Sequence, residues 1–219
     1  MRPMHPTTPV ERGVQLGAGT TVWDNLHIRA PARIGDECII GEKASIAHGV
    51  HIGERVKVNA FADICTGVTV EDRVMMSTGT VFTNDRFPRA TAPDLSALRG
   101  SGPDDHSGPT RVCEEATLGA RSVIGCNLIV GRWSMVGTGA VVTRSVPDFH
   151  LAVGQPARSV ACVCRCGQPF LRVSPRMPPD TDAASCPVCR MRYAVRDGAV
   201  TDLDTPQGSA PLAARREGR

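Results

Sequence analysis

The sequence is poor in aromatic residues, which make up 4% of its 219 residues. Its core must therefore be built from small aliphatic side chains, and its 22 glycines and 17 prolines predict many tight corners. No apolar run reaches the roughly 18 residues of a membrane-spanning helix, so we expect no membrane insertion. The formal net charge of +3 is small for this length and argues against a dedicated nucleic-acid binder.

The N-terminal stretch MRPMHPTTPVERG also lacks the apolar segment of a secretory signal peptide. We therefore expect a cytoplasmic protein, whose nine cysteines stay reduced because that compartment disfavours disulfides. Five of the nine cysteines fall between Cys162 and Cys189, which predicts a separate small unit near the C-terminus.

An aliphatic residue, or Met or Phe in its place, recurs at every sixth position, a spacing that matches neither a helix nor an ordinary strand. The register holds for twelve consecutive hexads, stops, and resumes for five more. The key residues are Leu16, Val22, Ile28, Ile34, Ile40, Ile46, Ile52, Val58, Ile64, Val70, Met76 and Phe82, and then Leu118, Ile124, Val130, Val136 and Val142. A repeat of this length predicts a solenoid.

Two other positions of the hexad indicate how the coil closes. The residue two places before the aliphatic one is usually small or β-branched, as at Ala44 and Ala62, and the residue after it is often glycine, as at Gly35 and Gly41. Each hexad thus predicts a short strand with two inward side chains and a corner where glycine adopts angles that other residues resist. Three hexads close a triangular coil, and stacked coils pair parallel strands about 4.8 Å apart. The predicted fold is an all-β, β-helical prism.

The repeat is interrupted after Phe82 by about thirty residues rich in Gly, Pro, Asp and Ser. Loops longer than about 12–15 residues are usually functional or disordered. We therefore predict a flap loop over residues 83–115, in which the stretch TNDRFPR at 83–89 has the more specific composition.

Three stretches carry a resemblance. The string VFTNDRFPR, the run from Trp23 to Ile28 and the ending GAVVTRSVPDFHLAVGQPAR resemble the hexapeptide-repeat acyltransferases over residues 14–160. Within these, the chain is similar to the N-acetyltransferases of the UDP-2-acetamido-3-amino-2,3-dideoxy-glucuronate type. The resemblance implies a left-handed β-helix, a homotrimer and acetyl-CoA lying between neighbouring prisms. Asp24 and Asn25 replace a His and an aromatic residue of that family, and Gln155 stands where Asn is commoner.

The resemblance also assigns candidate catalytic residues. Asn84 is expected to orient the substrate amine or the thioester, and His27 matches a family histidine and is the candidate base. For Asn84 and Asp85 an ordinary Asx-stabilised turn is the alternative, and for His27 a plain surface position. The departing CoA thiolate is another acceptor for the proton.

The remaining predicted site residues are assigned by the same resemblance or by their charge. Substrate contacts are expected from Trp23, Asp24, Asp85, Arg86 and Arg89. Acetyl-CoA contacts are expected from Gly137, Gly139, Arg144, Gly154, Pro156, Ala157 and Arg158. Arg144 and Arg158 are expected to meet the CoA phosphates because arginine pairs well with phosphate oxygens, with a solvated basic edge as the alternative. His48 and His51 stand only three apart, which makes a histidine metal site at this prism a weak hypothesis.

The cysteine-rich tail predicts a metal site. Cys164 and Cys166 face the Cys-x-x-Cys pair of Cys186 and Cys189 across nineteen residues, and four thiolates in two pairs are typical of a structural zinc ribbon. Cys162 with Cys164 is an alternative clamp, and a redox dithiol is the alternative function. We place an N-terminal arm at 1–13, a zinc-ribbon-like segment at 161–200 and a disordered tail at 201–219.

Together these patterns predict an acetyl-CoA-dependent N-acetyltransferase acting on the amino group, with the 3-amino group favoured, of a nucleotide-linked amino sugar. An O-acyltransferase on a sugar or small alcohol is the alternative enzyme. A trimeric scaffold that uses the prism as a rod is the alternative without catalysis. The flap and the GQPA ending favour the enzymes, because a rod requires neither.

Overall fold

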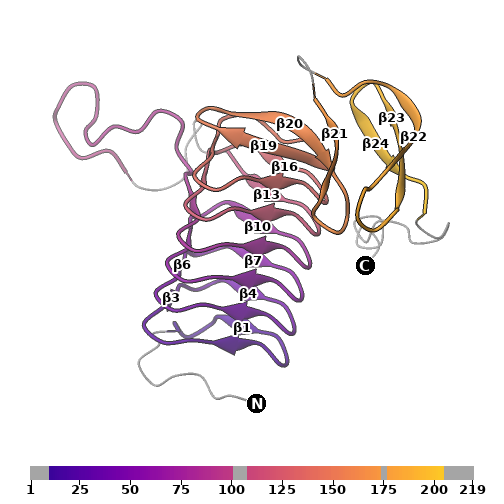
Figure 1. The fold of residues 1–219 in the computed structure, drawn as a ribbon. Coiled ribbons are helices and arrows are strands. Elements are labelled where there is room, and N and C mark those ends of the chain that lie inside the picture. The colour runs from indigo at the N-terminus through magenta and orange to yellow at the C-terminus, as the bar shows by residue number, and fades with distance from the viewer. Residues whose placement is uncertain (1–9, 101–107, 174–176, 205–219) are drawn as a thin grey trace, which may run out of the picture.

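The computed structural model describes residues 10–100, 108–173 and 177–204, and every regular element in them is a β-strand. The chain winds into stacked triangular coils with a flap on one side and a small sheet beside the upper coils (Figure 1). The predicted all-β parallel solenoid is confirmed, and its form is consistent with the left-handed β-helix that the resemblance implies. No helix in the described residues is long and apolar enough to cross a membrane.

Each side of the triangle is one sheet, and we number the sides in chain order. Face 1 holds β1 (Gln15–Leu16), β4 (Arg33–Ile34), β7 (His51–Ile52), β10 (Val68–Val70), β13 (Thr110–Val112) and β16 (Ile129–Val130). Face 2 begins with β2 (Thr21–Val22), β5 (Ile39–Ile40), β8 (Lys57–Val58), β11 (Met75–Met76), β14 (Thr117–Leu118) and β17 (Met135–Val136). Face 3 holds β3 (His27–Ile28), β6 (Ser45–Ile46), β9 (Asp63–Ile64), β12 (Val81–Phe82), β15 (Val123–Ile124) and β18 (Val141–Val142).

The core consists of the two inward positions of each hexad, as predicted. Ile28, Ile46 and Ile64 are fully buried, and so are the small residues that precede the aliphatic ones, such as Ala32. The exceptions lie in the first coil, where no full coil covers them from below: Leu16 is 39% exposed, and Val14 and Thr20 are only partly buried. Val10 pairs with Ile28 and packs on the core, so part of the predicted N-terminal arm joins the solenoid.

Glycine occurs after the aliphatic residue for a different reason from the one predicted. A Cβ added at Gly35 would lie 2.5 Å from the carbonyl oxygen of Gly53, and one at Gly41 would lie 2.6 Å from the backbone nitrogen of Ala60. These glycines do not have positive φ. They are required because successive coils approach too closely for a side chain. The left-handed backbone falls two residues later, often on non-glycine residues such as Lys43 and Phe61.

The flap is shorter than predicted. The register resumes at Val112, not at Leu118, because β13 pairs with β10 and buries Val112 completely. The interruption therefore runs over residues 83–109, of which 101–107 lie outside the described residues. Val112 stands six residues before Leu118, so it extends the second run of hexads by one.

The C-terminal segment caps the solenoid. Face 2 continues with β19 (His150–Gly154), β20 (Ala157–Val163) and β21 (Pro169–Arg172), the last two pairing antiparallel. A separate sheet holds β22 (Thr181–Ser185), β23 (Arg192–Arg196) and β24 (Ala199–Asp202). The start of the segment predicted at 161–200 thus belongs to the solenoid sheet, and its last strand ends two residues beyond the predicted boundary. The expected disordered tail beyond residue 204 lies outside the described residues.

The close approach of the coils predicts that Gly35→Ala destabilises the fold, because its Cβ would meet backbone that cannot move aside. Overpacking of this kind costs about 1–3 kcal/mol, which urea unfolding should detect. Gly100→Ala is the matched control, because a Cβ there meets nothing within 4 Å and the backbone φ is not positive. Equal unfolding midpoints for the two variants would show that close approach is not the constraint.

Candidate functional site

The stacking brings predicted site residues into columns along the corners of the prism. Asn84, Cys126 and Arg144 each stand two residues after paired strand residues, at the corner between face 3 and face 1. Asn84 is half-buried, and its amide makes no hydrogen bond to the described residues. A half-buried amide without an internal partner is available to a ligand at the point where the flap leaves the solenoid.

The flap beyond Asn84 is a small structure of its own. The carboxylate of Asp85 accepts a hydrogen bond from the Phe87 N–H at 2.7 Å and lies 3.4 Å from the Arg99 guanidinium. Thr91 pairs with Leu98 in an antiparallel bridge. The Asx turn that was the alternative for Asp85 is therefore present, and this carboxylate is engaged within the flap.

The two flap arginines predicted to contact substrate make only local contacts. The Arg86 guanidinium lies 5.5 Å from the centroid of the Phe87 ring, and Arg89 donates a hydrogen bond to the Pro88 carbonyl. Neither arginine forms an ion pair with a described residue. Both therefore keep their charge available to a ligand at the flap.

The residues predicted to contact acetyl-CoA gather at the upper end of the corner between face 2 and face 3. The loop 154–157 joins β19 to β20, and the Gln155 side chain donates a hydrogen bond to the Gly139 carbonyl at 2.7 Å. Gly137 lies beneath Val153, where a Cβ would come within 2.8 Å of that side chain. Arg158 donates to the Ala157 carbonyl. Only Arg144 lies apart, on the neighbouring corner.

Trp23, Asp24 and His27 lie in the first coil. The Nε2 atom of His27 is 3.3 Å from the Glu11 carboxylate, and its side chain is about half exposed. A backbone hydrogen bond from Ala30 chiefly lowers the pKa of Glu11, with His27 and Arg29 adding to the effect. Asn84 stands three coils above, roughly 14 Å away at about 4.8 Å per coil. One chain therefore does not bring His27 and Asn84 together.

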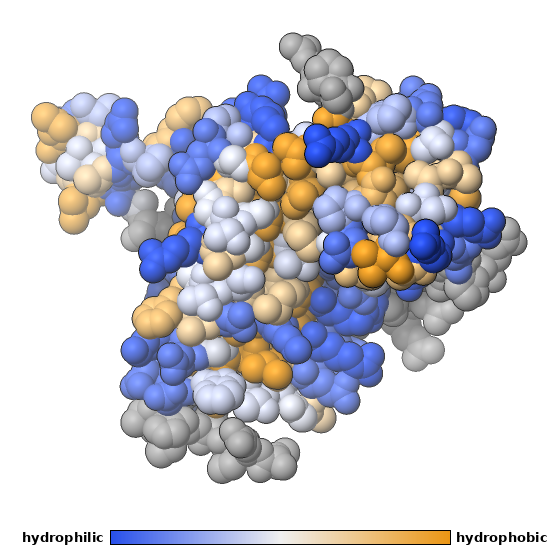
Figure 2. All heavy atoms as spheres, in the orientation of Figure 1, coloured by the Kyte–Doolittle hydropathy of each residue, from blue (hydrophilic) through white to orange (hydrophobic). Residues whose placement is uncertain are grey.

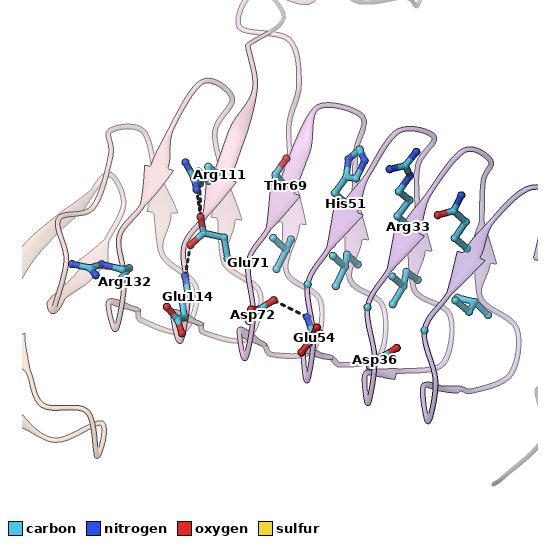
Figure 3. A pocket seen from close by; sticks show the side chains of 18 residues that line it. Arg33, Asp36, His51, Glu54, Thr69, Glu71, Asp72, Arg111, Glu114 and Arg132 are labelled. Carbon is cyan, nitrogen blue, oxygen red and sulfur yellow. Dashed lines mark hydrogen bonds and ion pairs between the residues drawn. The ribbon is translucent and has the colours of Figure 1, made fainter. Parts of the chain in front are cut away.

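A hollow of about 680 Å³ lies along face 1 and contains none of the residues predicted for catalysis, substrate or acetyl-CoA (Figure 3). Its charged walls are largely engaged in holding coils together. Asp36 accepts a hydrogen bond from the Ala18 N–H at 2.6 Å, Asp72 accepts one from the Glu54 N–H at 2.9 Å, and Glu71 pairs with Arg111. The positions of these carboxylates are therefore explained by the contacts that they make between coils.

The four predicted cysteine ligands converge. The sulfur atoms of Cys164, Cys166, Cys186 and Cys189 all lie within 4.8 Å of one another, and no other such group of metal-binding side chains occurs among the described residues. Cys162 is fully buried outside this cluster, so the alternative clamp is wrong. The His48 ring lies 3.4 Å from the Thr66 hydroxyl, and His51 lies on face 1. Neither histidine belongs to a metal-ligand cluster among the described residues.

The cluster fits a thiolate-bound metal. The Sγ–Sγ distance is 3.3 Å between Cys164 and Cys189 and 3.6 Å between Cys166 and Cys186, close to the spacing that four Zn–S bonds of about 2.3 Å require. The Tyr193 hydroxyl donates to the Cys164 sulfur at 3.1 Å. Burial raises the pKa of Cys186, but the backbone N–H groups of Cys189 and Val188 and the thiols of Cys166 and Cys189 together outweigh it and bring the pKa to about 6. A thiolate near neutral pH suits a metal ligand.

Comparisons with known proteins agree with the repeat. A family model described as the hexapeptide repeat of succinyl-transferase matches residues 31–60 and 109–144. The chain is 41% identical over 96 residues to a dTDP-3-amino-3,6-dideoxy-alpha-D-galactopyranose 3-N-acetyltransferase of Aneurinibacillus thermoaerophilus, covering 44% of this chain and 46% of that protein. It is 25% identical over 149 residues to the bifunctional protein GlmU of Nitratidesulfovibrio vulgaris, covering 66% of this chain and 31% of that protein.

Among solved structures, the acetyltransferase domain of PglB from Neisseria gonorrhoeae in complex with acetyl coenzyme A matches with a TM-score of 0.49 and 20% identity, covering 72% of this chain and 56% of that one. PerB from Caulobacter crescentus in complex with CoA and GDP-perosamine matches with a TM-score of 0.39 and 25% identity, covering 71% and 55%. The chain spans less than half the length of the curated relatives described above. The repeat, the three-faced solenoid and the sequence likeness make this chain similar to the hexapeptide-repeat acyltransferases.

Proposed function

We propose that the protein is an acetyl-CoA-dependent N-acetyltransferase acting on the 3-amino group of a nucleotide-linked amino sugar. The observation that carries this proposal is the 41% identity over 96 residues to an enzyme named for 3-N-acetylation of a dTDP-linked amino sugar. The subgroup that the FTND stretch resembles acts on UDP-linked sugars. The dTDP-linked and UDP-linked sugars both offer a 3-amino group to the thioester. The substrate class proposed is therefore a nucleotide-linked 3-amino sugar.

The reaction needs little from the protein beyond positioning and oxyanion stabilisation. The neutral amine nitrogen attacks the thioester carbonyl, the tetrahedral intermediate collapses, and CoA leaves as the thiolate while an amide bond forms. The nitrogen loses one proton, which passes to the thiolate or to a base. We assign Asn84 to orienting the amine or the thioester, because its half-buried amide has no partner among the described residues.

We further propose that the working unit is a homotrimer in which two chains complete each site. Within one chain the loop 154–157, Asn84 and His27 lie on different corners or several coils apart, which supports a site shared between neighbours. The flap also projects from its own solenoid with apolar side chains outward (Figures 1 and 2). Leu95 is 77% exposed and Leu98 is 81% exposed, as expected if they pack on a neighbour.

We propose that the four cysteines hold one structural zinc ion, and that the protein works in the cytoplasm, where these thiols stay reduced. The metal would tie the knuckle between β20 and β21 to the one between β22 and β23. Cys164, Cys186 and Tyr193 pack with Phe149 in a second core, separate from that of the solenoid. The metal's part is therefore structural, at the end of the prism.

The function is tested by incubating the protein with acetyl-CoA and dTDP- or UDP-linked 3-amino sugars, and Asn84→Ala is the informative variant. Loss of one well-placed donor should lower kcat by about 10²–10³-fold at saturating substrates. His27→Ala should cost much less if the CoA sulfur takes the proton, and its pH profile should follow the substrate amine. Near-normal turnover by Asn84→Ala would contradict the assignment, and a matching loss in His27→Ala would make His27 the base.

The trimer is tested by sedimentation of the double variant Leu95→Ser/Leu98→Ser. We expect weaker association with the coils still folded, because two exposed apolar contacts to the neighbour are removed. Leu203→Ser is the control, because Leu203 is an exposed leucine as well, at 41%, but lies beside the small C-terminal sheet and not on the flap. Unchanged association of the double variant would contradict a neighbour-packed flap.

The metal is tested by elemental analysis of protein purified under reducing conditions. We expect about one zinc per chain, lost in Cys186→Ser but kept in Cys126→Ser, whose cysteine lies outside the cluster. Zinc retained by Cys186→Ser would indicate that these four thiols are not its ligands.

A further inference from the structure

An aromatic ring stands exposed on the corner between face 2 and face 3. Lys43, Phe61, Gly79 and Arg121 each stand three residues after paired strand residues of β5, β8, β11 and β14, so they form one column that we call the Phe61 ledge. Backbone hydrogen bonds fix each step, from the Phe61 N–H to the Glu42 carbonyl and from the Gly79 N–H to the Ala60 carbonyl. The order of the column is therefore set by the coils.

Phe61 differs from the other aromatic residues in the same backbone state. Phe61, Trp133 and Phe149 all have φ near +60°, which is unusual for bulky side chains. Trp133 and Phe149 have rings 6.4 Å apart and pack in the core beneath the C-terminal sheet. Phe61 is 52% exposed, and the only ring contact among the described residues is the Lys43 ammonium, 5.0 Å from its centroid. A left-handed corner thus holds one aromatic ring toward solvent.

The coil after Phe61 leaves room beside the ring. Its equivalent residue is Gly79, which carries no side chain, and the next one is Arg121, whose Cγ lies 3.4 Å from the position of a Cβ added at Gly79. The backbones of Phe61 and Arg121 are two coils apart, roughly 10 Å at about 4.8 Å per coil, and the Arg121 side chain leans toward Gly79 within this span. A flat group stacked on a ring needs about 3.5 Å on each side. The missing side chain at Gly79 therefore leaves room for one planar group against the Phe61 ring, on the side toward Arg121.

The charges of the column point to an anion. On the corner between faces 1 and 2, Arg55 pairs with Glu37, and Arg73 pairs with Glu114 and Glu115. Lys43 and Arg121 on the ledge form no ion pair with a described residue. An aromatic ring can stack on a nucleobase, and two cations without an ion pair among the described residues can bind the diphosphate that the base carries.

We propose that the Phe61 ledge binds the nucleobase and diphosphate of the sugar acceptor, an inference that rests on the proposed function. Gly79 and Asn84 belong to the same coil and stand at the two edges of face 3, so the ledge and Asn84 lie at the same height along the prism. The adenine of CoA is separated from the thioester by the whole pantetheine arm and a diphosphate. A nucleobase is separated from its sugar by a ribose and a diphosphate only. The flat group closer to the reacting atoms is therefore the acceptor's base.

The experiment measures dissociation constants of dTDP, UDP and CoA by calorimetry for the wild type and three variants. Phe61→Ala should weaken dTDP or UDP binding by roughly 5–100-fold, the range of base–aromatic stacking, and leave CoA unchanged. Gly79→Asn should weaken it too, since Asn tolerates the left-handed backbone while its side chain fills the space beside an intact ring. Arg55→Ala, at the equivalent position of another corner, should bind all three ligands as the wild type does.

Each contrary outcome is distinct. Unchanged nucleotide affinity in Phe61→Ala and Gly79→Asn, with a binding wild type, overturns the ledge and leaves the proposed function standing. Weakened CoA binding in place of nucleotide binding overturns it in favour of the adenine. A wild type that binds CoA but neither dTDP nor UDP overturns the ledge together with the acceptor class of the proposed function.

Discussion

The backbone hydrogen bond from each coil to the next is the constraint on which the rest of this structure depends. The Gly35 N–H donates to the Ile52 carbonyl and the Gly53 N–H to the Val70 carbonyl, and the same step recurs along all three faces. It requires coils about 4.8 Å apart, and at corners such as Gly35 and Gly41 the next coil then leaves no room for a Cβ. It also makes each hexad position a column, so a change at one residue is felt by the residues directly above and below it.

This constraint explains how far sequence reasoning could go. The sixfold spacing is local and strong, so the core from Val22 to Val142 and the three faces could be predicted without a structure. The hexad at Val112 was missed although it stands six residues before Leu118, because the Gly-Pro pair at 108–109 and the two glutamates at 114–115 resemble loop sequence. The reason for glycine at the corner was misassigned, because a backbone contact between coils leaves the same sequence signature as an unusual backbone angle.

The candidate site shows the same limit in another form. The cysteine cluster was found from spacing alone, because four thiols in two pairs have few other uses. His27, Asn84 and Gly139 were found through the resemblance. That they lie on different coils and corners becomes visible only when each residue is assigned to its strand and coil. Phe61 and Lys43 were missed, because nothing in one hexad marks a corner residue whose neighbours above and below leave it open.

The strand edges at the two ends of the prism are covered in different ways. A stack of parallel coils exposes unpaired strand edges at each end, which invites further stacking. At the lower end Val10 pairs with Ile28, and little else covers Leu16. At the upper end β20 turns back antiparallel on β19, and the second core closes over Trp133 and Phe149. The strand β20 starts at the loop that carries Gln155 and ends beside Cys164. The cap that blocks the edge is therefore also the element that positions the proposed acetyl-CoA loop, and its far end is held by the cysteine cluster.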